Sequence, residues 1–216
     1  LFGIPEDIMS VKKLTAGKGI SIIEDAAQVM GSRYNGTLFG TQGDIGIFSF
    51  SRGKAISAGE GGVVITSSDS IANAISKQYS KVQNYGSLQS IRILIENIVL
   101  SLLINPWLFW LPKSIPFLKL GETIFDTHFI IKRFSGVQAG FARNWIRKIE
   151  KLNINRNNRI LQYKSLLSDC STHLLSDSFD INQLTCIRFP LLFKSHEKSA
   201  KLFDLSEKAG LGIAKT

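Results

Sequence analysis

Short apolar runs separated by glycine and charged residues dominate the first third of the chain. Residues 20–23, 45–50 and 63–66 are each too short for a globular helix and are rich in isoleucine, valine and phenylalanine, which indicates buried strands of a mainly parallel sheet. The connection between the last two runs is too short for a helical crossover. We therefore expect the third strand to run antiparallel to the second.

Helical signals alternate with these runs. Residues 1–19 indicate a loop followed by a helix, with Pro5 and Asp7 at its start and glycines at its end. The polar, glycine-rich residues 26–44 predict a short helix and a loop. Further along, the apolar spacing predicts helices over residues 70–83, 135–151, 159–167 and 196–209, and strands over residues 187–193 and 211–214.

Composition narrows the class of protein. The chain has 216 residues, of which 44% are hydrophobic, enough for a packed core. Its net charge of +9 is concentrated between residues 132 and 164. This charge is either the solvated face of an amphipathic helix or a field that favours an anionic substrate. No nucleic-acid recognition motif accompanies it, so we expect no nucleic-acid partner.

Neither metal ligands nor a membrane span is indicated. Cys170 and Cys186 have no zinc-site spacing to each other or to a histidine, and a reduced, cytoplasmic setting fits them best. The most apolar stretch, residues 91–118, is interrupted by charged residues and prolines. Its longest uncharged part, residues 97–112, is shorter than the roughly 20 residues of a spanning helix.

Lys54 is the strongest candidate for chemistry. It follows the run 45–50 on a tight turn and precedes the glycine cluster 59–62. A poorly solvated lysine there can act as a neutral nucleophile, as Schiff-base formation with an aldehyde requires, whereas most lysines are ordinary surface residues. Asp25 and Gln28 follow the first run, where Asp25 could instead cap the helix expected to follow. Ser49 ends the second run, where it could instead satisfy the backbone.

Five motifs in this order resemble the DegT/DnrJ/StrS sugar aminotransferases, a branch of the fold type I pyridoxal phosphate (PLP) enzymes. They are Gly3-Ile4-Pro5-Glu6-Asp7, Glu24-Asp25-Ala26-Ala27-Gln28, Gly40-Thr41-Gln42-Gly43-Asp44, Ser49-Phe50 with Lys54, and Gly59-Glu60-Gly61-Gly62. A looser likeness continues at Gly136-Val137-Gln138-Ala139, which is similar to the family's linker helix into the small domain.

The resemblance implies a role for each candidate residue. Lys54 would hold pyridoxal 5'-phosphate as a Schiff base and move the substrate proton, and Asp25 would pair with the pyridine nitrogen. Gln28 would contact the cofactor ring, and Ser49 its phosphate. The implied reaction is transfer of an amino group, from glutamate, to a nucleotide-linked keto sugar for cell-surface polysaccharide or amino-sugar biosynthesis. The implied assembly is a cytoplasmic homodimer.

The resemblance also implies a division of the chain. Residues 1–86 would be the C-terminal part of the cofactor-binding large domain, with the end of its mainly parallel sheet. Residues 87–134 would be an apolar insertion or connector, and residues 135–216 the linker helix and part of a smaller α+β domain. On this basis we expect the sequence to be a fragment truncated at both ends.

Departures from the family pattern leave three questions open. Ser51 stands where many members carry histidine, and Arg52 is an added cation that either touches phosphate or faces solvent. Residues 87–133 are longer and more apolar than the family core, and would form a dimer surface, a lid or a membrane-surface patch. There are two alternatives to a transaminase. One is a sugar dehydratase of the same fold, against which Lys54 argues, and the other is a non-catalytic regulator or scaffold associated with the membrane surface.

Overall fold

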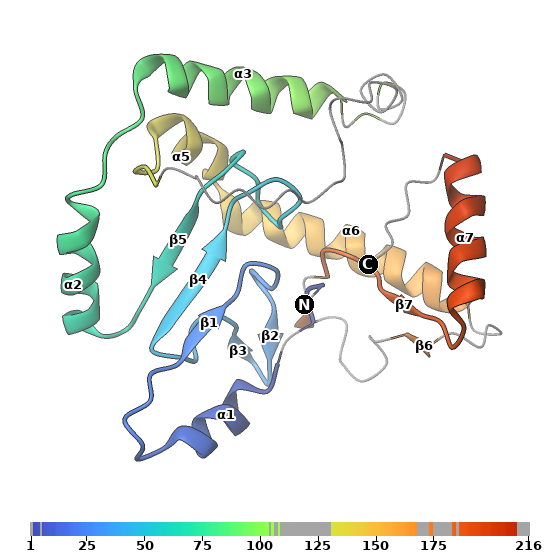
Figure 1. Ribbon diagram of the computed structural model, residues 1–216, viewed down its shortest axis with the longest axis horizontal. Coiled ribbons are helices and arrows are strands. Elements are labelled where there is room, and N and C mark those ends of the chain that lie inside the picture. The colour runs from blue at the N-terminus through green and yellow to red at the C-terminus, as the bar shows by residue number, and fades with distance from the viewer. Residues whose placement is uncertain are drawn as a thin grey trace.

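A three-stranded mixed sheet forms the centre of the first half of the chain (Figure 1). The computed structural model describes residues 2–4, 6–103, 105, 108, 131–167, 173–174, 183–184 and 186–210. The strands are β1 (Ile23–Asp25), β4 (Ile45–Ser49) and β5 (Gly62–Ile65), in the order β1-β4-β5. β1 is parallel to β4, and β5 is antiparallel to β4. The predicted reversal of the third strand is confirmed.

A hairpin of β2 (Arg33–Tyr34) and β3 (Thr37–Leu38) occupies the connection between β1 and β4. Its turn residues, Asn35 and Gly36, have φ values of 49° and 80°. Two positive φ angles in an Asn-Gly pair are typical of the tight turn that matches the twist of paired strands. The short helix predicted within residues 26–44 is therefore wrong.

The early helices follow the predictions. α1 (Ile8–Thr15) begins after Asp7, whose side chain accepts a hydrogen bond from the Ser10 amide at 3.1 Å. α2 (Asp69–Tyr79) begins after Ser68, which caps the Ile71 amide. The apolar insertion contributes α3 (Ser87–Leu103). In Figure 1, α3 lies across the top of the molecule beside α5.

The linker region differs from the prediction. Instead of one helix over residues 135–151 and another over 159–167, the structure has α5 (Gly136–Ala142) and a long α6 (Trp145–Leu166). The break lies at Asn144, whose φ of 58° is left-handed. No glycine or proline interrupts the chain after it, so α6 runs through both predicted segments.

The C-terminal part contains α7 (His196–Lys208), as predicted, and the short strands β6 (His173–Leu174) and β7 (Leu191–Leu192), which are antiparallel. Only residues 191 and 192 of the predicted strand 187–193 are in a strand. The predicted strand 211–214 lies outside the described residues.

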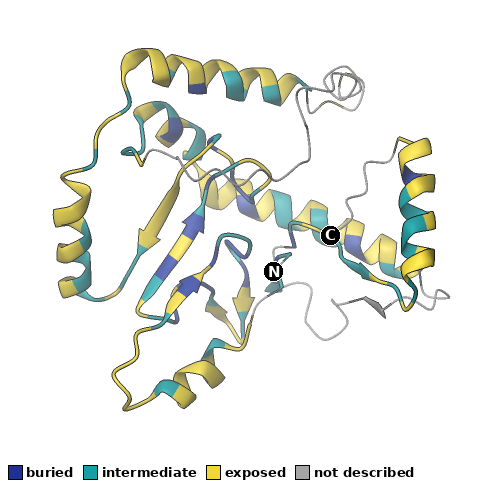
Figure 2. Cartoon of the chain, in the orientation of Figure 1, coloured by how far each residue is buried: buried dark blue, intermediate teal, exposed yellow. Residues whose placement is uncertain are grey.

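One face of β1 and β4 is buried and the other is open (Figure 2). Glu24, Gly46 and Phe48 point into the core, where α1, the β2-β3 hairpin, α5 and α6 contribute apolar side chains. On the opposite face Ile23 is 59% exposed and Ile47 is 39% exposed. The strands are thus covered on one side among the described residues, not on both as their apolar sequence predicts.

Gly46 allows the sheet to approach the loop that follows the hairpin. A methyl group there would collide with the backbone carbonyl of Gly40, which cannot move aside as a side chain could. We expect Gly46→Ala to lower the free energy of unfolding by about 2–3 kcal/mol in a chemical denaturation experiment. Gly140→Ala is the matched control, since it lies in α5 with nothing within 4 Å of the added carbon. The control should be stabilised by about 0.5–1 kcal/mol, and equal effects of the two changes would contradict this account.

Candidate active site

Two of the candidate residues lie at the same edge of the sheet. Asp25 is the last residue of β1 and Ser49 the last residue of β4. Because β1 and β4 are parallel, their carboxyl ends meet at one edge, where ligands bind in open α/β sheets. Asp25 pairs with Ile47 in the register, and Ile47 and Ser49 are two residues apart. The side chains of Asp25 and Ser49 therefore project from the same, open face.

Asp25 and Gln28 are held by backbone contacts. Asp25 is exposed, and its Oδ1 accepts a hydrogen bond from the Ala27 amide at 3.1 Å. Gln28 is half-buried, and its Oε1 accepts one from the Phe2 amide at 2.7 Å. Both side chains keep polar atoms for a ligand: Asp25 its second carboxylate oxygen, and Gln28 its amide nitrogen.

Ser49 satisfies the backbone of its own turn. Its Oγ accepts a hydrogen bond from the Ser51 amide at 3.2 Å, the role expected of a serine at a strand end. A hydroxyl group that accepts one hydrogen bond still has its own proton to donate. The contact is therefore compatible with a phosphate oxygen at the same side chain.

Lys54 lies in the loop between β4 and β5, beyond the same edge of the sheet. The Phe50 amide donates to Gly61 and the Ala58 amide donates to Phe50, each at 2.8 Å, so the loop is closed at its base. Ala55, Ile56 and Ala58 anchor it in the core. Lys54 itself is half-buried, and no described carboxylate forms an ion pair with its amine. Its desolvation is thus partial, less than the sequence predicts.

Arg52 contacts α3. Its guanidinium donates to Glu96 at 2.9 Å, and Glu96 also binds Arg92 at 2.6 Å. On the other side of the loop, a methyl group at Gly59 would lie 2.5 Å from the Nδ2 atom of Asn97. The Arg52 side chain is 57% exposed, so it faces solvent while it holds this salt bridge. A contact between Arg52 and a phosphate group stays a prediction. The insertion helix thus packs against the lysine loop at two points.

Glu24 has a structural role that the sequence analysis missed. Its buried carboxylate accepts hydrogen bonds from the amides of Gly40 at 2.8 Å, and of Gln42 and Gly43 at 2.5 Å each. Asp44 closes the same loop by accepting from the Ile22 amide at 2.7 Å. The alternation of residues along a strand places either Glu24 or Asp25 in the core, where an acid needs several hydrogen-bond donors, but the donors themselves are far away in the sequence.

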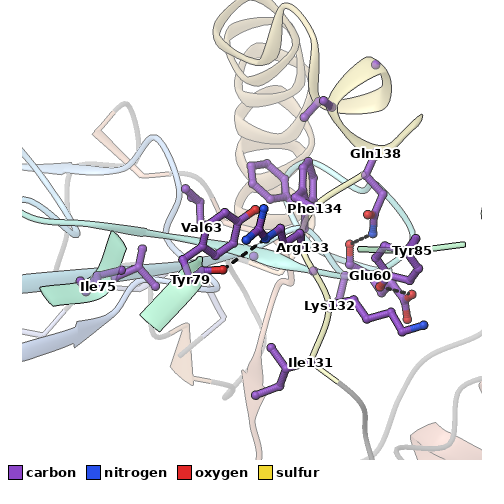
Figure 3. Close-up of a pocket in the computed structure, with 18 of the residues that line it drawn as sticks. Glu60, Val63, Ile75, Tyr79, Tyr85, Ile131, Lys132, Arg133, Phe134 and Gln138 are labelled. Atoms are coloured by element: carbon purple, nitrogen blue, oxygen red, sulfur yellow. Dashed lines mark hydrogen bonds between the residues drawn. The ribbon is translucent and has the colours of Figure 1, made fainter. Parts of the chain in front are cut away.

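A groove of about 1290 Å³ opens beside the glycine cluster, between β5, α2, α5 and residues 131–134 (Figure 3). Tyr85 donates to the Glu60 carboxylate at 2.7 Å, and Gln138 donates to the Glu60 carbonyl at 3.0 Å. Burial, and then the Glu60 carboxylate, raise the pKa of Tyr85 to about 12. Tyr85 is therefore a neutral donor that ties the glycine cluster to the segment after α2. None of Asp25, Gln28, Ser49 and Lys54 lines this groove.

The described residues were also searched for metal sites, membrane-spanning helices and cysteine pairs. Over the described residues, no cluster of three or more histidine, cysteine, aspartate or glutamate side chains could hold a metal ion, and no helix is long and apolar enough to cross a membrane. Cys186 is a free, buried thiol whose pKa is raised by burial. Cys170 lies outside the described residues.

Curated relatives match part of the chain. GDP-perosamine synthase from Escherichia coli O157:H7 is 44% identical over 66 residues, which are 31% of this chain and 18% of the relative. A UDP-N-acetyl-3-dehydro-alpha-D-glucosamine 3-aminotransferase from Acidithiobacillus ferrooxidans is 36% identical over 91 residues, 42% of this chain and 24% of the relative. The matched segments are therefore a quarter or less of each of these relatives.

Solved structures match nearly the whole chain. PseC from Helicobacter pylori, an aminotransferase, has a TM-score of 0.65 at 18% identity, over 98% of this chain and 48% of PseC. The aminotransferase TlmJ from Streptoalloteichus hindustanus has a TM-score of 0.67 at 17% identity, over 95% of this chain and 47% of TlmJ. The predicted α/β fold, that of the fold type I PLP enzymes, is confirmed, and the chain spans about half the length of these neighbours.

The family itself is identified by a match along the sequence. The model of the DegT/DnrJ/EryC1/StrS aminotransferase family, which includes the sugar aminotransferases that the motifs resemble, matches residues 1–214. This match extends from the lysine region through the insertion to α7 and beyond. The chain belongs to the DegT/DnrJ/EryC1/StrS aminotransferase family.

Proposed function

We propose that the chain carries the lysine-bearing wall of a PLP-dependent aminotransferase, which moves an amino group from glutamate to a nucleotide-linked keto sugar. One observation carries the proposal. Asp25 and Ser49 project from one face at the carboxyl edge of β1 and β4, and Lys54 lies in the loop directly beyond that edge. A carboxylate, a hydroxyl and a primary amine are thus grouped where this class of fold binds ligands.

The donor set fits pyridoxal phosphate. Asp25 has a carboxylate oxygen left to accept a hydrogen bond from the protonated ring nitrogen, because its other oxygen accepts from Ala27. Ser49 has a hydroxyl proton for a phosphate oxygen, and Gln28 an amide nitrogen for the ring. Lys54 has an amine that no described acid neutralises and that would hold the aldehyde. When bound, the cofactor supplies an electron sink for a carbanion.

Lys54 would also act as the acid and base of the reaction. Its Nζ would accept the proton from the carbon that carries the amino group and return a proton to the cofactor carbon. Asp25 would keep the ring nitrogen protonated, and the hydrogen bond from Ala27 would keep its carboxylate oriented. The closed base of the loop, from Phe50 to Gly61, would hold Lys54 at a constant distance from the strand edge.

The printed names of relatives support the substrate class. They include GDP-perosamine synthase and a UDP-linked and a dTDP-linked sugar aminotransferase. Each name joins a nucleoside diphosphate to an amino sugar, and a protein of net charge +9 favours such an anion. We include in the proposal that the enzyme is cytoplasmic and acts as a homodimer. Its product would supply amino sugars for cell-surface polysaccharides. The proposal also keeps the division of the chain into residues 1–86, 87–134 and 135–216.

A dehydratase is the second candidate. A GDP-4-keto-6-deoxy-D-mannose-3-dehydratase from E. coli has a TM-score of 0.63 to this chain at 16% identity, close to the scores of the aminotransferases. The fold therefore does not separate the two reactions. Lys54 favours the aminotransferase, because in the dehydratase branch histidine typically replaces it.

Product analysis separates the candidates. The complete protein encoded with this sequence would be incubated with PLP, L-glutamate and a set of nucleotide-linked keto sugars, and the products identified by mass spectrometry. We expect an amino sugar and 2-oxoglutarate in equal amounts, and neither with Lys54→Ala. A product that has lost water and gained no nitrogen would identify the dehydratase instead. Neither product from a folded, PLP-loaded protein would favour the regulator or scaffold.

A further inference from the structure

Helix α3 is bound to its own chain on one side only. On the bound side Ile93 is buried, Glu96 forms a salt bridge with Arg52, and Asn97 lies against Gly59. The opposite side is uncovered among the described residues, and Figure 2 shows α3 mostly in the colour of exposed residues. A surface helix ordinarily turns its apolar side inward and its polar side to solvent. In α3 the polar residues are held against the chain and apolar residues face outward.

The outward side is a continuous apolar strip. Its residues recur every three or four positions, with Val99 beside the row, so they lie on one side of the helix. We call this set the α3 apolar face; it consists of Leu88, Ile91, Ile95, Ile98, Val99 and Leu102, each of them at least 44% exposed. The face exposes on the order of 600 Å², the upper end for the largest apolar patch on a soluble monomer. Patches of this size mark contacts with proteins or membranes.

The chemistry of the α3 apolar face suits hydrocarbon. All its side chains are aliphatic, and none can donate or accept a hydrogen bond. Protein–protein interfaces combine apolar contacts with about one hydrogen bond per 100–200 Å² and are enriched in aromatic residues. The hydrocarbon of a bilayer offers no hydrogen-bond partner and suits side chains that need none. The face therefore fits lipid chains better than a protein surface.

Cations surround the α3 apolar face. The side chain of Arg92 is 80% exposed and that of Arg52 is 57% exposed. Lys132 is exposed and donates a hydrogen bond to Gln89 of α3. Glu96, the one acid of α3, is shared by the two arginines. Three cations against one acid leave this rim positive, and a positive rim attracts the headgroups of anionic lipids.

The sequence directly after α3 has the composition of a membrane interface. Residues 97–112 carry no charge and include Trp107 and Trp110. Tryptophan is enriched where a membrane meets water, because its ring is apolar and its N–H is polar. Among the described residues no helix is long and apolar enough to cross a membrane. A helix such as α3 can instead lie in the plane of the interface.

We propose that the α3 apolar face rests on an anionic phospholipid membrane, with Arg52, Arg92 and Lys132 among the headgroups. The inference goes beyond the proposed function and does not depend on it, since it requires only the helix and its exposed face. It also gives the apolar insertion a purpose. Of its three possible roles, dimer surface, lid or membrane patch, the aliphatic face and the positive rim favour the last.

Flotation of the complete protein with lipid vesicles tests the contact. The variant Ile95→Glu/Ile98→Glu places two charges in the apolar face. Asn73→Glu/Gln78→Glu is the matched control, because it makes the same change in net charge on exposed positions of α2. We expect the wild type and the control to float with vesicles of phosphatidylcholine and phosphatidylglycerol, and the face variant to bind them at least about 30-fold more weakly. Circular dichroism melting verifies that all three proteins are folded.

Vesicles of phosphatidylcholine alone test the role of the cations. Without anionic headgroups we expect wild-type binding to weaken by at least about 5-fold, and salt should weaken binding to the anionic vesicles. Hydrogen exchange of the wild type adds a readout that needs no variant. The amides of α3 should exchange more slowly when anionic vesicles are present, whereas those of α2 should not change.

Three results would overturn the proposal. The first is a folded wild type that floats with neither kind of vesicle. The second is equal binding of the face variant and the control to anionic vesicles. The third is a face variant whose sedimentation mass falls below that of the wild type while the wild type binds no vesicles, which would assign the α3 apolar face to a contact between protein subunits.

Discussion

Replacing Glu24 by glutamine is expected to lower the free energy of unfolding by about 3 kcal/mol. Glu24 is 4% exposed, and its carboxylate accepts hydrogen bonds from three backbone amides. A glutamine side chain presents one oxygen and one amino group, so at least one buried N–H would face another donor. The loop from Gly40 to Gly43 would lose its anchor.

Chemical denaturation measures this effect directly. Glu150→Gln is the control, because Glu150 is exposed on α6 and should change the stability by less than about 0.5 kcal/mol. A loss of under about 1 kcal/mol in Glu24→Gln would show that the loop does not depend on the carboxylate. In that case the presence of a buried carboxylate at Glu24 would need another explanation.

Asp25→Asn should reduce the rate of amino transfer by at least about 100-fold while leaving the fold intact. Asparagine can still accept the hydrogen bond from the Ala27 amide, so the turn after β1 should be kept. It carries no negative charge, however, and cannot stabilise a protonated ring nitrogen as a carboxylate does. The cofactor would then be a weaker electron sink.

Steady-state kinetics with a thermal melt tests this prediction. We expect kcat to fall while the melting temperature stays within a few degrees of the wild type. Wild-type activity in Asp25→Asn would contradict the assignment of Asp25 to the ring nitrogen, and would leave Asp25 as a turn-capping residue only.

Local patterns predicted much of the fold. The runs 45–50 and 63–66 became β4 and β5 with the expected antiparallel pairing, and Asp7 caps α1 as expected. The β2-β3 hairpin had an equally local signal in Asn35-Gly36, which the prediction of a helix within residues 26–44 overlooked. The Asn35-Gly36 pair alone was thus sufficient to predict the hairpin.

Other features depend on contacts between distant residues. Glu24 is anchored by amides sixteen to nineteen positions away, and Arg52 binds Glu96 across forty-four positions. Position 46 must be glycine because the backbone of Gly40 leaves no space for a side chain, and the periodicity of the sequence does not reveal this contact. The break between α5 and α6 at Asn144 likewise has no strong local signal, because asparagine is tolerated within helices.

Reduction of the PLP-loaded protein with borohydride tests the central claim, that Lys54 holds the cofactor. The complete encoded protein would be reduced and digested, and the phosphopyridoxyl-labelled peptide located by mass spectrometry, with Lys54→Arg as the control that keeps the charge but cannot form the linkage. We predict the label on Lys54 in the wild type and no label in Lys54→Arg. A folded wild-type protein with no label, or with the label on another lysine, would contradict the account.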